Sequence, residues 1–127
     1  MNILVTGATG YIGPFLVNKL KALGHTVVIL VRKKEDFHRL ESEGFKCILG
    51  DVTKKESLVG IFKNIEILFH LANIASWWLP NNQTYYDVNV KGTVNLFEEA
   101  KKFPLKKVIH ISSIAAIRRP EGIIANE

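Results

Sequence analysis

Short apolar runs alternate with longer amphipathic segments along this chain, and the alternation restricts the folds open to it. In the longer segments, apolar side chains recur at helical spacing, which predicts helices over residues 11–23, 34–43, 56–63 and 83–102. The apolar runs predict strands at Ile3–Val5, Thr26–Val31, Phe45–Leu49, Ile65–Leu71 and Val108–Ile111. Because strands that alternate with helices pair in parallel, the pattern predicts an α/β fold with a doubly wound parallel sheet of about five strands.

Length and composition indicate a single domain over residues 1–127. Hydrophobic residues make up 47% of the chain, which excludes wholesale disorder. The single cysteine excludes a disulfide framework, and the four histidines share no metal-ligand spacing, so we expect no metal site. No apolar run reaches the roughly 18 residues of a membrane span, and the N-terminus does not resemble a signal peptide. We therefore expect a cytoplasmic protein with no membrane partner.

The formal net charge of +5 raises the question of nucleic-acid binding. The basic residues are scattered in pairs between apolar segments, as at Lys33–Lys34 and Lys54–Lys55. The sequence has neither a long basic block nor stacking aromatic residues interleaved with the basic ones. A solvated surface therefore explains the charge better, and we expect no nucleic-acid partner.

A glycine-rich segment, Thr6–Gly13, joins the first predicted strand to the first predicted helix. Gly7 permits a tight turn out of the strand, Gly10 leaves room for a pyrophosphate against bare backbone, and Gly13 lets the helix approach the sheet. The N–H groups of the loop and the positive end of the helix would hold the anion. We assign the other loop residues Thr9, Tyr11 and Ile12 to the same site.

Glycines at this spacing, placed between a strand and a helix, predict a Rossmann-type sheet that binds a dinucleotide. The alternative is a plain turn in which Gly13 serves only helix packing. A P-loop nucleotide triphosphatase is not supported, because no Gly-Lys-Ser or Gly-Lys-Thr follows the loop.

The end of the second predicted strand bears on the choice between NADP and NAD. Arg32 stands where that strand ends, and its guanidinium could grip a 2′-phosphate and stack on adenine, which favours NADP. Glu35 and Asp36 follow closely, and either could instead bind the ribose hydroxyls of NAD, although both also suit the first turn of a helix.

With these residues in view, the chain resembles the extended short-chain dehydrogenases/reductases, also called the NAD-dependent epimerase/dehydratase family. The Thr6–Gly13 segment matches the Thr-Gly-x-x-Gly-x-x-Gly fingerprint of that family. Four further segments resemble family motifs in the same order along the chain: Gly50–Val52, His70–Ala72, Asn89–Leu96 and Ile111–Ser113.

The resemblance implies a role for each segment. Asp51 and Val52 would meet the adenine, and Leu71 and Ala72 would pass the nicotinamide ribose. Ser113 would hydrogen-bond a substrate hydroxyl or carbonyl group. Asn89 would help a backbone and water network to hold a catalytic lysine, or would simply be a satisfied buried amide.

One feature of the resembled family is missing from these 127 residues. Its proton donor is a tyrosine followed four residues later by a lysine, on the helix after the fifth strand. Here the residues four positions after the three tyrosines are Phe15, Asn89 and Val90, and the chain stops at Glu127 before that helix could form. We therefore expect the domain to be the incomplete N-terminal part of such an enzyme, truncated after the fifth strand.

These features predict the NAD(P)-binding part of an oxidoreductase or a sugar-nucleotide epimerase/dehydratase that acts by hydride transfer. Alone, the chain should bind nucleotide and turn over little or nothing, with a small-molecule substrate only in a full-length protein. The alternative is a non-enzymatic NAD(P)-sensing or interaction module. The apolar strand Val108–Ile111 would be a sheet edge, so we also expect a homodimer or other self-association.

Overall fold

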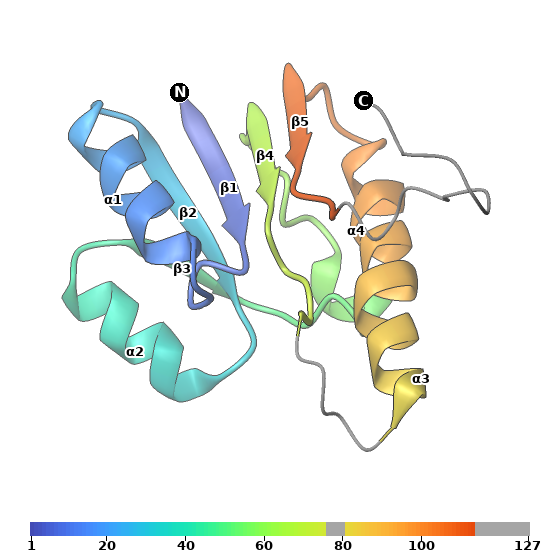
Figure 1. The fold of residues 1–127 in the computed structure, drawn as a ribbon. Helices are drawn as coiled ribbons and strands as arrows, with labels where there is room; N and C mark the ends of the chain where they lie inside the picture. Colours follow the sequence, from blue (N-terminus) through green and yellow to red (C-terminus); the bar gives the residue numbers. More distant parts are fainter. Residues whose placement is uncertain (76–80, 114–127) are drawn as a thin grey trace, which may run out of the picture.

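Five parallel strands form one sheet in the computed structural model, which describes residues 1–75 and 81–113. The strand order is β3-β2-β1-β4-β5, and every neighbouring pair is parallel (Figure 1). The strands are β1 (Asn2–Thr6), β2 (Thr26–Val31), β3 (Lys46–Leu49), β4 (Ile67–His70) and β5 (Lys107–His110). The predicted five-stranded, doubly wound fold is thus confirmed.

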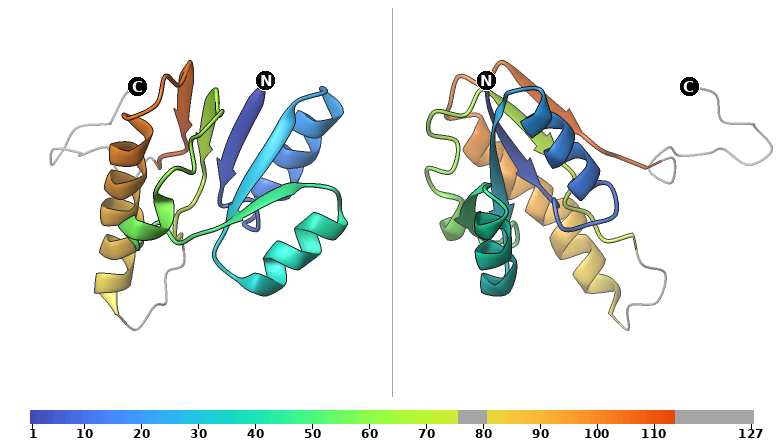
Figure 2. Two further views of the ribbon diagram at one scale, coloured as in Figure 1. Left: turned by 180° about the vertical axis from the view of Figure 1, so that it is seen from behind. Right: turned by 90° about the vertical axis from the view of Figure 1, so that its left-hand side faces the viewer.

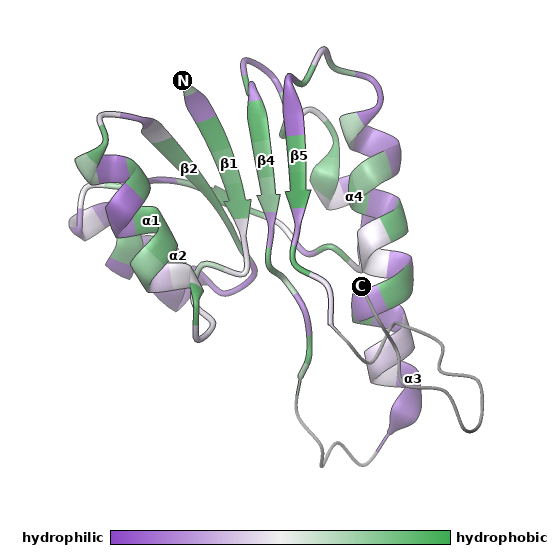
Figure 3. Ribbon diagram, turned by 45° about the horizontal axis from the view of Figure 1, so that its top comes forward, coloured by the Kyte–Doolittle hydropathy of each residue, from purple (hydrophilic) through white to green (hydrophobic). Residues whose placement is uncertain are grey.

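Helices cover both faces of this sheet, as the turned views of Figure 2 show. Within the described residues, the α-helices are α1 (Gly13–Ala22), α2 (Lys34–Ser42), α3 (Asn82–Tyr85) and α4 (Thr93–Ala100). One buried cluster joins α1 and α2 to alternate residues of β1 and β2, including Ile3 and Val5. The other joins α4 to the residues that face the opposite way, including Leu4 and Leu68. In Figure 3 the strands are largely hydrophobic, whereas the helices also carry hydrophilic residues.

The chain reverses its winding between β1 and β4. The sequence runs outward from β1 through β2 to β3, and then crosses to β4 on the other side of β1. The carboxyl ends of β1 and β4 therefore face a crevice at the switch point, where sheets of this kind bind ligands. Thr6 pairs with His70 in the β1–β4 register, so the two strands end level with each other.

Two helical segments differ from their sequence prediction. In place of a helix over 56–63, the chain forms a 3₁₀ helix, η1 (Lys55–Leu58). It stops because Val59 is extended and Gly60 has a φ of 77°. In place of one regular helix over 83–102, α3 and α4 flank a π-helical segment, η2 (Tyr86–Gly92). Side-chain periodicity did not reveal either change, since 3₁₀, α and π turns differ by a fraction of a residue.

Within residues 1–75 and 81–113, the structure contains no helix that is both long enough and apolar enough to cross a membrane.

The turn after β1 touches the chain after β4. Gly7 has a φ of 73°, and a Cβ atom there would lie 2.6 Å from both the carbonyl carbon of Leu71 and the main-chain nitrogen of Ala72. Both constraints require glycine, because other residues rarely adopt this φ and the backbone cannot retreat.

We expect Gly7→Ala to destabilise the fold by about 3 kcal/mol or more, since it adds a clash to backbone strain. Gly24→Ala is a matched control, because Gly24 has a φ of 78° but a Cβ atom there would have no neighbour within 4 Å. The free energy of unfolding of Gly24→Ala should fall by only about 1–2 kcal/mol. Urea denaturation measures both values, and equal losses would show that the contact with Leu71 and Ala72 has no energetic weight.

Candidate functional site

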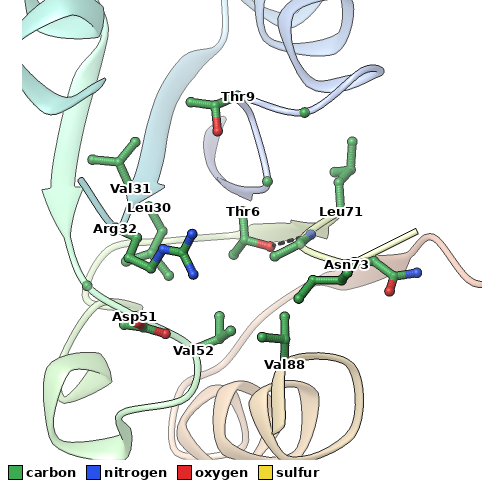
Figure 4. Close-up of a pocket in the computed structure, with 15 residues that line it drawn as sticks. Thr6, Thr9, Leu30, Val31, Arg32, Asp51, Val52, Leu71, Asn73 and Val88 are labelled. Atoms are coloured by element: carbon green, nitrogen blue, oxygen red, sulfur yellow. Dashed lines mark hydrogen bonds between the residues drawn. The ribbon is translucent and has the colours of Figure 1, made fainter. Parts of the chain in front are cut away.

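A pocket of about 250 Å³ lies at the carboxyl ends of β1, β2 and β4. Three walls enclose it: the glycine loop after β1, the ends of β2 and β3 with the residues that follow them, and the segment after β4 (Figure 4). Val88, from η2, closes its floor. The pocket lies at the switch point, where sheets of this kind bind ligands.

The glycine loop presents bare main chain to this pocket. The Gly10 N–H donates to the Gly7 carbonyl oxygen at 3.0 Å, which closes the turn. A Cβ on Gly10 would find a single neighbour within 4 Å, the Gly7 oxygen at 3.3 Å, so the space above Gly10 is open. A Cβ on Gly13 would instead lie 2.4 Å from the backbone of Ala8. The backbone nearest to Gly13 is therefore that of the loop itself.

The second wall carries charge. In Figure 4 the guanidinium of Arg32 points into the space between Asp51 and Thr6. Asp51 is held by its neighbour Thr53, whose main-chain N–H and hydroxyl both donate to Oδ1, at 2.9 and 2.8 Å. Within the described part of the chain, Asp51 Oδ2 makes no hydrogen bond and Arg32 makes no ion pair. An acceptor and a cation thus stand ready on one side of the pocket.

The third wall, Leu71 to Ile74, is fixed by hydrogen bonds at its two ends. The Leu71 N–H donates to the Thr6 carbonyl oxygen at 3.1 Å, and the Ala72 N–H donates to Thr6 Oγ1 at 3.2 Å (Figure 4). Asn89 clamps Ile74, since its Oδ1 accepts from the Ile74 N–H at 2.8 Å and its Nδ2 donates to the Ile74 oxygen at 3.0 Å. Both polar atoms of the Asn89 side chain are therefore hydrogen-bonded to the main chain of Ile74.

Most of the site residues proposed from the sequence meet at this pocket. Those that line it are Gly7, Thr9, Gly10, Arg32, Asp51, Val52, Leu71 and Ala72. Tyr11, Ile12 and Gly13 belong to the glycine segment but do not line the pocket, and Tyr11 is 93% exposed. Asn89 acts on Ile74 from behind the wall. Ser113 is exposed beyond the end of β5 and is not among the lining residues.

The sequence analysis quoted the lining residues Thr6 and Gly50 as parts of its motifs, but it assigned no role at the site to Leu30, Val31, Ile74 or Val88. For Leu30 and Val31 a signal existed, because both stand at the carboxyl end of a predicted strand, and parallel sheets bind ligands at that end of their strands. Val88 had none, since its apolar side chain fitted a buried helix stripe equally well.

Buried His70 lies behind the third wall. Burial first, and the neighbouring His110 second, lower the pKa of His70 from 6.5 to about 4. The two rings stack, with centroids 5.0 Å apart and planes 21° apart. At neutral pH His70 is therefore an uncharged imidazole inside the fold.

Known proteins resemble this chain in sequence and in fold. The chain matches the NAD dependent epimerase/dehydratase family over residues 3–125. It belongs to this family.

Two relatives are similar to this chain over part of their length. Sterol demethylase protein B of Methylococcus capsulatus is 35% identical over 123 residues, which cover 96% of this chain and 38% of the relative. A UDP-glucose 4-epimerase of Mycolicibacterium smegmatis is 39% identical over 122 residues, which cover 89% of this chain and 39% of the relative. The chain thus spans less than two fifths of the length of these relatives.

Several solved structures share the fold of this chain. The structure of gox2253 is 35% identical with a TM-score of 0.81, over 97% of this chain and 38% of its own. A short-chain dehydrogenase/reductase superfamily protein from Agrobacterium tumefaciens with bound NAD is 26% identical and has a TM-score of 0.76. The match covers 95% of this chain and 36% of that protein. Yeast methylglyoxal/isovaleraldehyde reductase Gre2, complexed with NADPH, is 24% identical and has a TM-score of 0.82. The match covers 93% of this chain and 39% of the reductase, and it shows a similarity of fold alone.

We expect His70 alone to lower the free energy of unfolding of this family member by about 2 kcal/mol between pH 7 and pH 5. Unfolded histidine takes up a proton near its ordinary pKa of 6.5, whereas the folded chain keeps His70 neutral to about pH 4, so acid favours unfolding. Urea denaturation at both pH values measures the loss. His70→Asn should remove most of it, and an undiminished pH dependence in that variant would contradict the assignment.

Proposed function

We propose that residues 1–127 bind a nicotinamide dinucleotide as the cofactor-binding part of an oxidoreductase or of a sugar-nucleotide epimerase/dehydratase. One observation carries the proposal: main chain without side chains, at Gly10, opens directly into a pocket at the switch point of the sheet. A pyrophosphate needs such close access to N–H groups at the start of a helix, and α1 begins three residues later.

The other two walls suit the two ends of a dinucleotide. Asp51 Oδ2 is available to accept a hydrogen bond from the adenine amino group, and Val52 and Val88 offer apolar surface for the base. On the opposite side, Leu71 and Ala72 allow a ribose to approach closely. Tyr11, Ile12 and Gly13 act through the start of α1, and Asn89 acts through Ile74. These features suit a dinucleotide bound along the pocket.

We propose NADP as the preferred cofactor, with NAD as the alternative. The Arg32 guanidinium points into the pocket and has no carboxylate partner within the described residues, so its full charge is available to a 2′-phosphate. Asp36 is partly engaged by Arg39, at 3.2 Å, which leaves it less suited to the ribose hydroxyls that NAD would present.

The nicotinamide, when bound, supplies hydride chemistry, and Ser113 would hydrogen-bond a small-molecule substrate there. These 127 residues contain no tyrosine followed four residues later by lysine, so they lack the acid/base pair of the family. We therefore propose binding with little or no turnover by the chain alone. A non-enzymatic NAD(P)-sensing module is the second candidate. It predicts that even a natural form of the protein longer than these 127 residues does not turn over substrate.

Gly10→Ala is the sharpest variant for the proposed binding. The added methyl group meets only the Gly7 oxygen, so stability should change by about 0.5 kcal/mol, as at other exposed positions. It would nevertheless push a pyrophosphate off the loop N–H groups, and the affinity for NADPH should fall about tenfold or more.

Isothermal titration calorimetry measures this affinity, with Gly24→Ala at the far end of α1 as the control that should bind normally. No binding of NADPH or NADH by the unaltered chain would end the proposal. Normal binding by Gly10→Ala would place the pyrophosphate elsewhere.

Arg32→Ala tests the preference for NADP. Loss of a charged partner for the 2′-phosphate should weaken NADPH binding about tenfold or more and leave NADH binding nearly unchanged. Lys63→Ala removes the same charge at the opposite edge of the sheet, near Asn2 and Thr26, and should affect neither ligand. Equal losses for NADPH and NADH in Arg32→Ala would remove the role assigned to this residue.

We also propose that the chain forms a homodimer or larger assembly through β5. Within the described residues, β5 pairs with β4 on one side only. Val108 in β5 is 43% exposed, and Ile111 just after the strand is 41% exposed. Light scattering at increasing concentration should show a rising mass, and Val108→Lys should suppress it. A constant monomer mass at high concentration would refute this association.

A further inference from the structure

The buried side chain of His70 is the centre of a hydrogen-bond chain that crosses from Thr6 in β1 to Thr93 in α4. Its Nδ1 lies 2.7 Å from Thr6 Oγ1, and its Nε2 lies 3.0 Å from Thr93 Oγ1. His70 and Thr6 are 0% and 1% exposed. Water does not reach these groups, so each must find its partner within the protein.

The neighbouring bonds determine where each proton lies. The Thr93 hydroxyl donates to the Asn89 carbonyl oxygen at 2.8 Å, and a hydroxyl has one hydrogen to give. Thr93 Oγ1 can therefore only accept from His70, so the ring proton is on Nε2. In a neutral imidazole Nδ1 is then the acceptor, and the Thr6 hydroxyl donates to it.

The resulting chain has a single direction: Thr6 donates to His70, His70 to Thr93, and Thr93 to the Asn89 carbonyl. The opposite tautomer would leave Nε2 facing an oxygen whose hydrogen is already used, and a charged imidazole would deprive Thr6 of its acceptor. Burial of His70, which lowers its pKa to about 4, agrees with the neutral ring.

Both ends of this chain reach the third wall of the pocket. At one end, Thr6 Oγ1 also accepts the Ala72 N–H at 3.2 Å. At the other end, the Asn89 carbonyl oxygen accepts the last hydrogen bond of the chain. The side chain of Asn89 in turn hydrogen-bonds both the N–H and the carbonyl oxygen of Ile74. Ala72 and Ile74 both line the pocket, whereas His70 itself does not.

We propose that His70, held as the Nε2–H tautomer, is a positioning residue that ties Thr6 to Thr93 and Asn89 and so sets the Ala72–Ile74 wall of the dinucleotide pocket. The inference rests on the proposed binding of a dinucleotide at that pocket. His70 acts through the wall and does not touch the ligand. A residue that merely stabilised the fold would alter the melting temperature without altering the affinity of the folded chain.

Two variants cut the arm of the chain that leads to Thr93 and leave an acceptor for Thr6 in place. In His70→Asn, the asparagine amide occupies the place of Nδ1. This variant therefore keeps an acceptor for the Thr6 hydroxyl but loses the hydrogen bond to Thr93. Thr93→Val keeps the shape of Thr93 but removes both of its hydrogen bonds, and Thr93→Ser restores the hydroxyl. His110→Phe is the matched control, because His110 stacks on the same ring but is exposed and takes no part in the chain.

Calorimetry with NADPH, well below the melting temperature of each variant, is the first measurement. We expect the dissociation constant to rise about tenfold in His70→Asn and in Thr93→Val, as for one lost buried hydrogen bond, and to recover in Thr93→Ser. His110→Phe should bind normally. Normal affinity in folded Thr93→Val, or no recovery in Thr93→Ser, would overturn the proposal.

Nitrogen-15 spectra of the imidazole, recorded without any ligand, are the second measurement. They should show one neutral ring with its proton on Nε2, and Thr93→Val should shift the Ala72 and Ile74 amide signals. A ring protonated on Nδ1 would overturn the inference even if NADPH binds. A wild-type chain that binds neither NADPH nor NADH would overturn the proposed function, and the effect on affinity with it, so the two failures can be told apart.

Discussion

The close contact between the turn after β1 and the chain after β4 is the constraint on which the pocket depends. At Gly7 the two backbones approach until no Cβ could fit between them, and the Thr6 carbonyl and hydroxyl oxygens take the N–H groups of Leu71 and Ala72. Two strands distant in sequence are thereby joined at their carboxyl ends. Any ligand held by the glycine loop must then lie beside the segment that follows β4.

The two buried clusters support this junction from opposite faces of the sheet. Ile3 and Val5 pack under α1 and α2, whereas Leu4 and Leu68 pack under α4. Because the helices change face between β1 and β4, the crevice at the strand ends is left uncovered by either layer. The pocket is thus a product of topology, and side chains only give it its chemical character.

That chemical character differs from wall to wall. The glycine loop offers main-chain donors, the second wall offers the cation of Arg32 and the acceptor of Asp51, and the third wall is small and apolar at Leu71 and Ala72. An elongated ligand with an anionic middle and two unlike ends matches this order. Hydrogen bonds made behind the walls, by Thr53 and Asn89, keep the walls in place without entering the pocket.

The sequence by itself determined the alternation of strands and helices, the sheet of five parallel strands and the glycine loop, because apolar period and glycine spacing are local properties. It also brought together Arg32, Asp51 and Ala72, which stand just after strand ends. Only the tertiary structure decided the 3₁₀ turn at Lys55–Leu58, the π segment and the partners of His70. These depend on which distant groups meet inside the fold, and no spacing along the chain records that.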